Sequence, residues 1–82
     1  MRVEYLDGAS FQCEVLEAEL PVLVDFSATW CAPCKILDPI VTQVAQTWKE
    51  KVKVEKLDVE AYPDLVMQYQ VMAVPTLILF IN

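Results

Sequence analysis

The sequence that decides the fold is the hexapeptide at residues 30–35, Trp30-Cys31-Ala32-Pro33-Cys34-Lys35. An apolar run before it predicts a strand, and the helical pattern after it places the two cysteines at a helix N-terminus. Unpaired N–H groups and the positive end of the helix dipole at that position favour a thiolate over a thiol. Because the thiolate is the attacking species in disulfide exchange, Cys31 and Cys34 form a candidate redox pair. Pro33 suits the first helical turn, where an N–H is not needed.

Two other roles for the cysteine pair are a structural disulfide and a metal site. A disulfide across so short a loop restrains the unfolded chain by only ~2 kcal/mol, against ~4–5 kcal/mol for a loop of about 100 residues. Structural zinc needs about four nitrogen or sulfur ligands, and the chain has no histidine and one further cysteine, Cys13. The redox interpretation is therefore favoured, and no metal site is expected.

The composition excludes several classes of protein. With 82 residues, the chain is expected to form one domain, residues 1–82, and its 56% hydrophobic content predicts a folded protein. A net charge of −6 with scattered basic residues argues against nucleic-acid binding. Neither a signal peptide nor an apolar run of the ~18 residues needed to span a bilayer is evident, so we expect no membrane association and a cytoplasmic location.

The hydrophobic pattern predicts alternating strands and helices. Strands are expected at 2–6, 22–27, 52–59 and 77–81, and helices at 10–18, 33–49 and 64–70. Ser10 is the predicted N-cap of the first helix, and Pro39 should kink the second. Cys13, on the first helix, is interpreted as a small buried or half-buried hydrophobe, with a regulatory thiol as the alternative.

Two charged residues fall in strands that should be largely buried. Asp25 stands in an apolar strand that is typical of a central position, where an ionised carboxylate is costly unless paired. It is either at a solvated strand end or a buried acid with a raised pKa near the cysteine pair. Lys56 shares a strand face with Val52 and Val54, so it is either a snorkelling surface lysine or a charge partner of Asp25.

The order of these elements resembles the thioredoxin family. The motifs that carry the resemblance are Val24-Asp25-Phe26-Ser27-Ala28-Thr29-Trp30-Cys31-Ala32-Pro33-Cys34-Lys35, Lys56-Leu57-Asp58-Val59 and Val74-Pro75-Thr76. The resemblance implies an α/β fold with a central mixed sheet of about four strands flanked by helices. It also implies a thiol–disulfide oxidoreductase that reduces protein disulfides. An oxidase or isomerase of the same fold is disfavoured, since Ala32-Pro33 contains no histidine or charged residue.

The resemblance implies a catalytic role for four residues. Cys31 would be the exposed attacking thiol and Cys34 the buried resolving thiol. Asp25 would relay a proton to or from Cys34, and Lys56 would modulate that acid. The thiols themselves carry the electrons, so no bound cofactor is expected. Electrons would come from a thioredoxin reductase of the NADPH/FAD or ferredoxin type.

The resemblance also implies a substrate-binding surface around the cysteine pair. The Val74–Pro75 bond would be cis and face the pair, with the backbone of Val74 pairing with an extended segment of a disulfide-containing protein substrate. Trp30 would shield one side of the disulfide. Ala32 and Pro33 complete this surface; the family usually has glycine at the first of these positions, so we expect a small shift in redox potential.

The chain is shorter than the family pattern, which continues with one more strand and a final helix. Without that helix, about four large side chains would stay unburied, at ~1.5–3 kcal/mol each. The apolar strand at 77–81 would then be an exposed edge. We therefore expect that the chain is not an isolated monomer: it either forms a homodimer through this strand or exchanges elements with a second copy. The alternative function is a truncated thioredoxin-fold interaction or assembly module with little catalytic turnover.

Overall fold

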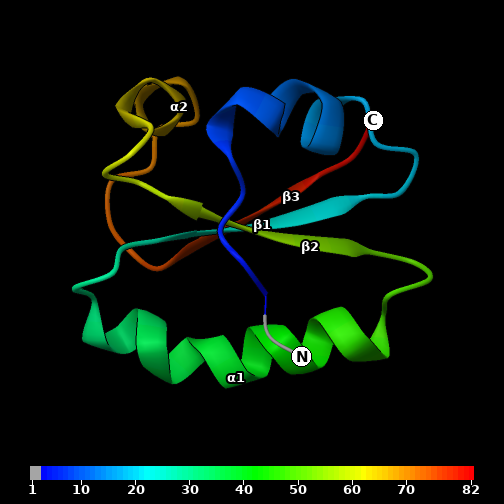
Figure 1. The fold of residues 1–82 in the computed structure, drawn as a ribbon, viewed down its shortest axis with the longest axis horizontal. Coiled ribbons are helices and arrows are strands. Elements are labelled where there is room, and N and C mark those ends of the chain that lie inside the picture. Colours follow the sequence, from blue (N-terminus) through cyan, green and yellow to red (C-terminus); the bar gives the residue numbers. More distant parts are fainter. Residues whose placement is uncertain (1–2) are drawn as a thin grey trace.

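The computed structural model describes residues 3–82, and its strands and helices form three layers (Figure 1). A sheet lies in the middle, with one long helix on one face and three short helical segments on the other. The elements in chain order are η1 (Gly8–Ser10), η2 (Gln12–Leu16), β1 (Val22–Ser27), α1 (Ala32–Thr47), β2 (Lys53–Asp58), α2 (Pro63–Gln68) and β3 (Thr76–Phe80).

The sheet has β1 at its centre, in the order β2-β1-β3. β1 pairs in parallel with β2 and antiparallel with β3, so the sheet is mixed, as predicted. The structure differs in having three strands within residues 3–82 instead of about four. Of the first predicted strand, Arg2 lies outside the described residues. The rest forms an isolated bridge between Tyr5 and Lys56, with the Leu6 N–H donating to the Lys56 carbonyl at 2.6 Å.

The first predicted helix is two short segments, and its cap is not the predicted one. The Asp7 carboxylate caps η1 by accepting from the Ala9 N–H at 3.0 Å, so the prediction of Ser10 as the N-cap is wrong. η2 is a π-helix that turns Phe11 and Val15 into the core. This orientation directs Cys13 to solvent, and the expectation that Cys13 is buried is therefore also wrong.

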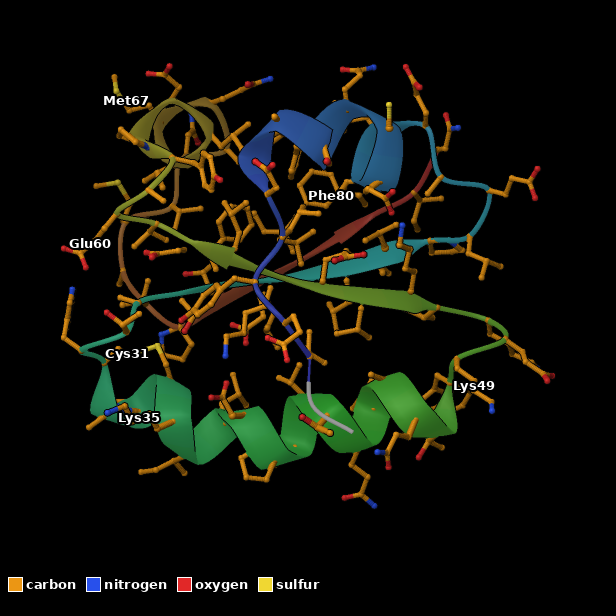
Figure 2. The ribbon with its side chains drawn as sticks, viewed as in Figure 1. Cys31, Lys35, Lys49, Glu60, Met67 and Phe80 are labelled. Atoms are coloured by element: carbon orange, nitrogen blue, oxygen red, sulfur yellow. A yellow bond between two sulfur atoms is a disulfide. The ribbon has the colours of Figure 1, made fainter. Side chains whose placement is uncertain are left out.

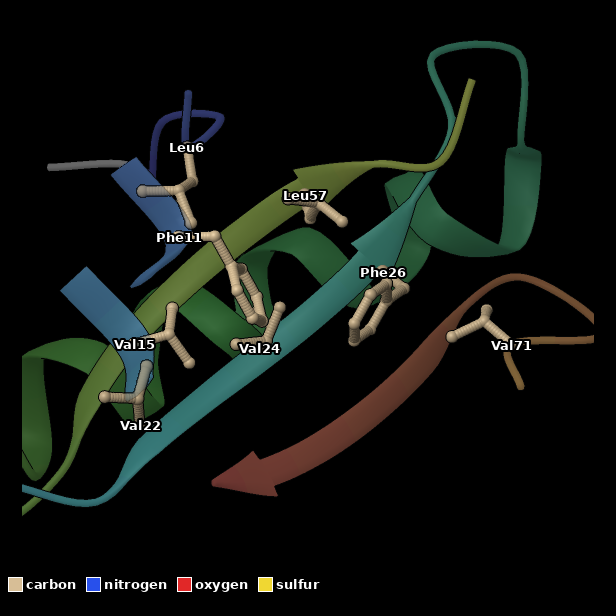
Figure 3. Packing of buried hydrophobic residues seen from close by; sticks show 8 residues of the cluster. All are labelled: Leu6, Phe11, Val15, Val22, Val24, Phe26, Leu57 and Val71. Carbon is tan, nitrogen blue, oxygen red and sulfur yellow. The ribbon is translucent and has the colours of Figure 1, made fainter. Parts of the chain in front are cut away.

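The main hydrophobic core lies between the sheet and the layer of η1, η2 and α2 (Figure 1), and Figure 3 shows its buried residues against the sheet. Three aromatic rings, those of Phe11, Tyr69 and Phe80, close one side of it with centroid separations of 5.0–5.6 Å. The buried members of this core are Leu6, Phe11, Val15, Val22, Val24, Phe26, Leu57 and Val71. Because alternate residues of β1 point into this core, Asp25 faces the opposite layer, which contains α1.

β3 is an edge strand with one buried and one exposed face. Ile78 and Phe80 pack against the core, whereas Leu77 and Leu79 are 44% and 49% exposed on the α1 side of the sheet. The sequence-based prediction of an exposed, apolar last strand is confirmed for these residues. α1 covers the sheet mainly through Cys34 and Val41 and continues through Pro39 without ending there.

Replacement of Gly8 by alanine should destabilise the fold for a steric reason. A Cβ on Gly8 would lie 2.7 Å from Cγ of the Tyr62 ring, which also donates a hydrogen bond to Asp7 at 3.1 Å. We expect Gly8→Ala to lower the free energy of unfolding by about 1–3 kcal/mol, measured by urea denaturation. The neighbouring exposed substitution Ala9→Ser should leave it nearly unchanged. A Gly8→Ala variant as stable as the parent would contradict the proposed clash.

Candidate active site

Cys31 and Cys34 form a disulfide at the N-terminus of α1 (Figure 2). Cys31 is the N-cap residue, in an extended conformation, and its Sγ accepts a hydrogen bond from the Cys34 N–H at 3.2 Å. The Cα atoms of the pair are 5.2 Å apart. Ala32 and Pro33 form the exposed first positions of the helix. The structure thus confirms that the pair lies at a helix N-terminus, where a backbone N–H points at the sulfur of Cys31.

Both cysteines are buried in this oxidised state. Cys31 is 3% and Cys34 1% exposed, and together with Ala28 they form a small cluster against which Val59 and Val74 pack. The expectation that Cys31 is exposed is therefore wrong for the disulfide form. The reason is tertiary packing: Val74 from the loop after α2 and Val59 from the segment after β2 pack against the cysteine cluster. This packing cannot be predicted from residues 30–35 alone.

The loop before β3 contributes Val74, which packs on the cysteine cluster together with Val59. The Val74–Pro75 peptide bond is cis, as the resemblance implied. Trp30 is 66% exposed. It lines, with the loop, an apolar hollow of about 370 Å³ formed by Trp30, Val59, Val66, Val71, Met72, Ala73 and Val74. Its shielding of the disulfide stays a prediction.

Asp25 is a fully buried carboxyl group. Its exposure is 0%, and neither carboxylate oxygen has a hydrogen-bond partner among the residues that the structure describes. The pKa of Asp25 is raised from its ordinary value of 3.8 to about 6, and burial is the largest cause. The negative charge of Asp38 contributes to this rise, and the positive charge of Lys56 opposes it. The interpretation of Asp25 as a buried acid is confirmed, and a solvated strand end is excluded.

Lys56 lies beside Asp25 but does not form an ion pair with it. The two residues are register partners on β2 and β1, yet the Lys56 ammonium is 3.3 Å from both carboxylate oxygens of Asp38 on α1. The ammonium also lies 4.5 Å from the centre of the Tyr5 ring. The predicted Lys56–Asp25 pair is therefore wrong as a direct contact. Lys56 is only 7% exposed, which also excludes a surface lysine.

Two residues at this site were missed by sequence reasoning, namely Asp38 and Tyr5. The spacing of Cys34 and Asp38 was an available signal, because residues four apart share one face of a helix. No comparable local pattern points to Tyr5, which reaches Lys56 through an isolated bridge. Within residues 3–82, no group of His, Cys, Asp or Glu side chains is arranged to hold a metal ion, and none of the helices has the length and apolarity to cross a membrane.

Comparison with known proteins gives consistent matches. The thioredoxin family model matches residues 2–82. A thioredoxin of Rickettsia felis is 47% identical over 74 residues, which cover 90% of this chain and 70% of that protein. A thioredoxin of Synechocystis is 47% identical over 75 residues, 92% of this chain and 70% of that protein. A bifunctional thioredoxin reductase/thioredoxin of Mycobacterium leprae is 46% identical over 72 residues, 88% of this chain and 16% of that protein.

The buried acid predicts how stability changes with pH. With a pKa of about 6 in the folded state and 3.8 when unfolded, Asp25 binds more protons in the folded protein between these values. Its contribution therefore lowers stability as the pH rises from about 4 to about 6, and the loss is complete above about 6. This difference in pKa corresponds to about 3 kcal/mol.

We accordingly expect Asp25→Asn to be more stable than the parent at about pH 8, by up to about 3 kcal/mol, with a difference that shrinks towards about pH 4. Urea denaturation across this pH range measures it. Asp64→Asn, at an exposed position of α2, is the matched control and should show no such trend. A stability difference that does not change with pH would contradict the raised pKa.

Proposed function

The chain belongs to the thioredoxin family and is a thiol–disulfide oxidoreductase that reduces protein disulfides; from this premise we propose how its residues share the reaction. The observation that carries the proposal is the cysteine pair at the N-terminus of α1, on the side of the sheet where the buried Asp25 carboxyl group lies without a hydrogen-bond partner among residues 3–82. The cysteine pair supplies the two electrons, and the Asp25 carboxyl group accepts one proton.

The first step is the attack of the Cys31 thiolate on a substrate disulfide. One substrate S–S bond breaks, a mixed disulfide between Cys31 and the substrate forms, and the first substrate sulfur leaves as a thiolate that takes a proton from water. The hydrogen bond from the Cys34 N–H to the Cys31 sulfur supports this role, because such a bond is stronger when its acceptor is charged. The helix dipole acts in the same direction.

The second step is the resolution of the mixed disulfide by Cys34. The Cys34 thiol loses its proton to the Asp25 carboxylate, attacks the Cys31 sulfur, and forms the disulfide that the structure contains. The second substrate sulfur leaves and is protonated. Asp25 and Cys34 both lie between the sheet and α1, and both are essentially inaccessible to water, at 0% and 1% exposure. A carboxylate with a pKa of about 6 is a stronger base than an ordinary aspartate.

The hollow next to the disulfide is the proposed substrate-binding surface. Trp30 and Met72 are 66% and 92% exposed there, and Val74 links this surface to the buried cysteine cluster. Exposed apolar side chains of this kind favour the binding of an extended protein segment. We propose that the segment pairs with the backbone of Val74, beside the cis Pro75, and contacts Ala32 and Pro33 at the start of α1.

Turnover needs an external source of electrons. Each cycle leaves the Cys31–Cys34 pair oxidised, so two electrons and two protons must be returned to it. The name of the Mycobacterium leprae relative joins a thioredoxin reductase to a thioredoxin, which supports such a reductase as the partner. We propose a reductase of the NADPH/FAD or ferredoxin type, no cofactor bound to this chain, and a reducing cytoplasm as the location.

We also propose that two copies of the chain associate through β3. This strand is at the edge of the sheet and exposes Leu77 and Leu79, and Ile81, directly after it, is 73% exposed. An edge strand with exposed apolar side chains readily pairs with a strand of another chain. The same surface is the observation that favours the alternative function, an interaction or assembly module, and an activity assay separates the two functions.

The chain should accelerate the reduction of insulin disulfides by dithiothreitol, and Cys31→Ser should remove all of this acceleration because the attacking sulfur is lost. Turbidity of the released insulin B chain measures the rate. Cys34→Ser should stop the cycle after the first step and accumulate a mixed disulfide that mass spectrometry detects.

The matched control for these substitutions is Cys13→Ser, since Cys13 is exposed and lies outside the pair. It should retain the full rate. If the parent chain reduces insulin no faster than Cys31→Ser, the reductase function is excluded for this chain and the assembly module becomes the better description.

Association through β3 predicts a dimer in sedimentation velocity at high protein concentration. Leu79→Lys should shift the species to the monomer, because it places a charge in the apolar edge without disturbing the buried face of β3. Met67→Lys on α2, where the side chain is 77% exposed, is the matched control and should leave the dimer intact. A parent chain that sediments only as a monomer would contradict this proposal.

A further inference from the structure

We infer that Asp38 is a positioning residue that holds the Lys56 ammonium away from the Asp25 carboxyl group and thereby keeps Asp25 free to accept a proton. This inference rests on the proposed role of Asp25 as proton acceptor for Cys34. It extends that role by naming the residue that regulates it. The hydrogen bonds of the Asp38 carboxylate within residues 3–82 go to the Lys56 ammonium.

The first argument is the direction in which the Lys56 side chain extends. Asp25 and Lys56 are register partners in a parallel pair, so their side chains leave the same face of the sheet. A cation at that place would pair with Asp25 unless another group attracted it more strongly. The structure shows the ammonium at 3.3 Å from both oxygens of Asp38, while both oxygens of Asp25 have no partner within residues 3–82.

The second argument is that Lys56 is held from two sides. The Asp38 carboxylate approaches from α1, and the Tyr5 ring lies 4.5 Å from the ammonium on the side of the N-terminal segment. A cation over an aromatic face is attracted by the ring. The Leu6 N–H also donates to the Lys56 carbonyl, which anchors that segment to β2. The Lys56 side chain is only 9% exposed, so little water competes for its ammonium.

The third argument is that few other charges face Asp25. On β3 its register partner is Leu77, which carries no charge. On β2, Lys53 and Glu55 alternate away from Lys56, and Lys53 pairs with Glu14 of η2 and with Glu55. Asp58, on the same face of β2 as Lys56, accepts a hydrogen bond from the Glu60 N–H at 2.9 Å. Among residues 3–82, the charges that act on Asp25 are therefore those of Asp38 and Lys56.

Asp38 acts on Asp25 in two ways, and both disfavour ionisation of the Asp25 carboxyl group. Its own negative charge disfavours ionisation of Asp25, and its pairing with Lys56 withholds the cation that would favour ionisation. If Lys56 moved to Asp25, the carboxylate would gain a charged hydrogen bond, its pKa would fall, and it would become a weaker base for the Cys34 proton. Asp38 can play this part at low cost, since its own side chain is 38% exposed and remains hydrated.

The test is a double-mutant cycle read out on Asp25 itself. The carboxyl carbon of Asp25 is followed by NMR across pH in the oxidised parent chain, in Asp38→Asn, in Lys56→Met, and in the double variant. We expect Asp38→Asn to lower the pKa of Asp25 by about one or more in the parent background. In the Lys56→Met background the same substitution should lower it clearly less, because no cation remains to be redirected.

Asp38→Glu, which keeps the charge, should restore the parent value, and Asp64→Asn on α2 should leave it unchanged. An unchanged or higher pKa of Asp25 in Asp38→Asn overturns the inference. Equal decreases with and without Lys56 also overturn it, because Asp38 would then act only through its own charge. The titration needs neither substrate nor turnover. Failure of the reductase function would instead appear as an inactive parent chain in the insulin assay.

Discussion

Burial of β1 on both faces is the constraint on which the rest of the structure depends. The strand pairs with β2 on one side and β3 on the other, and the chain runs from its last residue, Ser27, into the loop that carries Cys31. A strand in this position cannot move without disturbing both layers, so it gives the cysteine pair a rigid support. It also places Asp25 where water does not reach, which makes the carboxyl group costly to ionise.

The two faces of the sheet have different tasks. The face towards η1, η2 and α2 holds an apolar cluster with three aromatic rings and provides most of the hydrophobic stabilisation. The face towards α1 carries the buried charges Asp25 and Lys56 beside the disulfide. The buried charges therefore lower stability on the α1 face, which carries the disulfide. Such a cost is common for groups whose pKa is tuned for proton transfer. Asp38 and Tyr5 belong to this second face because they determine where the lysine charge rests.

The edge formed by β3 gives the protein a second chemically distinct surface. Its outward side chains are apolar, whereas the charge network lies at the opposite edge, where Tyr5 bridges to β2. The hollow beside the disulfide is a third apolar region, lined by Trp30 and Met72. In the proposals above, a protein substrate meets this hollow and a second copy of the chain meets β3.

Elements with local signals could be predicted from the sequence alone. The apolar run into Cys31, the helical periodicity after it, and the spacing of the cysteines predicted β1, α1 and the redox pair, because each depends on residues close together in the chain. Burial of Cys31, exposure of Trp30 and Cys13, and the partner of Lys56 were decided only by tertiary structure. Each of these depends on which distant segment packs against the residue, and for Lys56 on a competition between two carboxylates that no local pattern ranks.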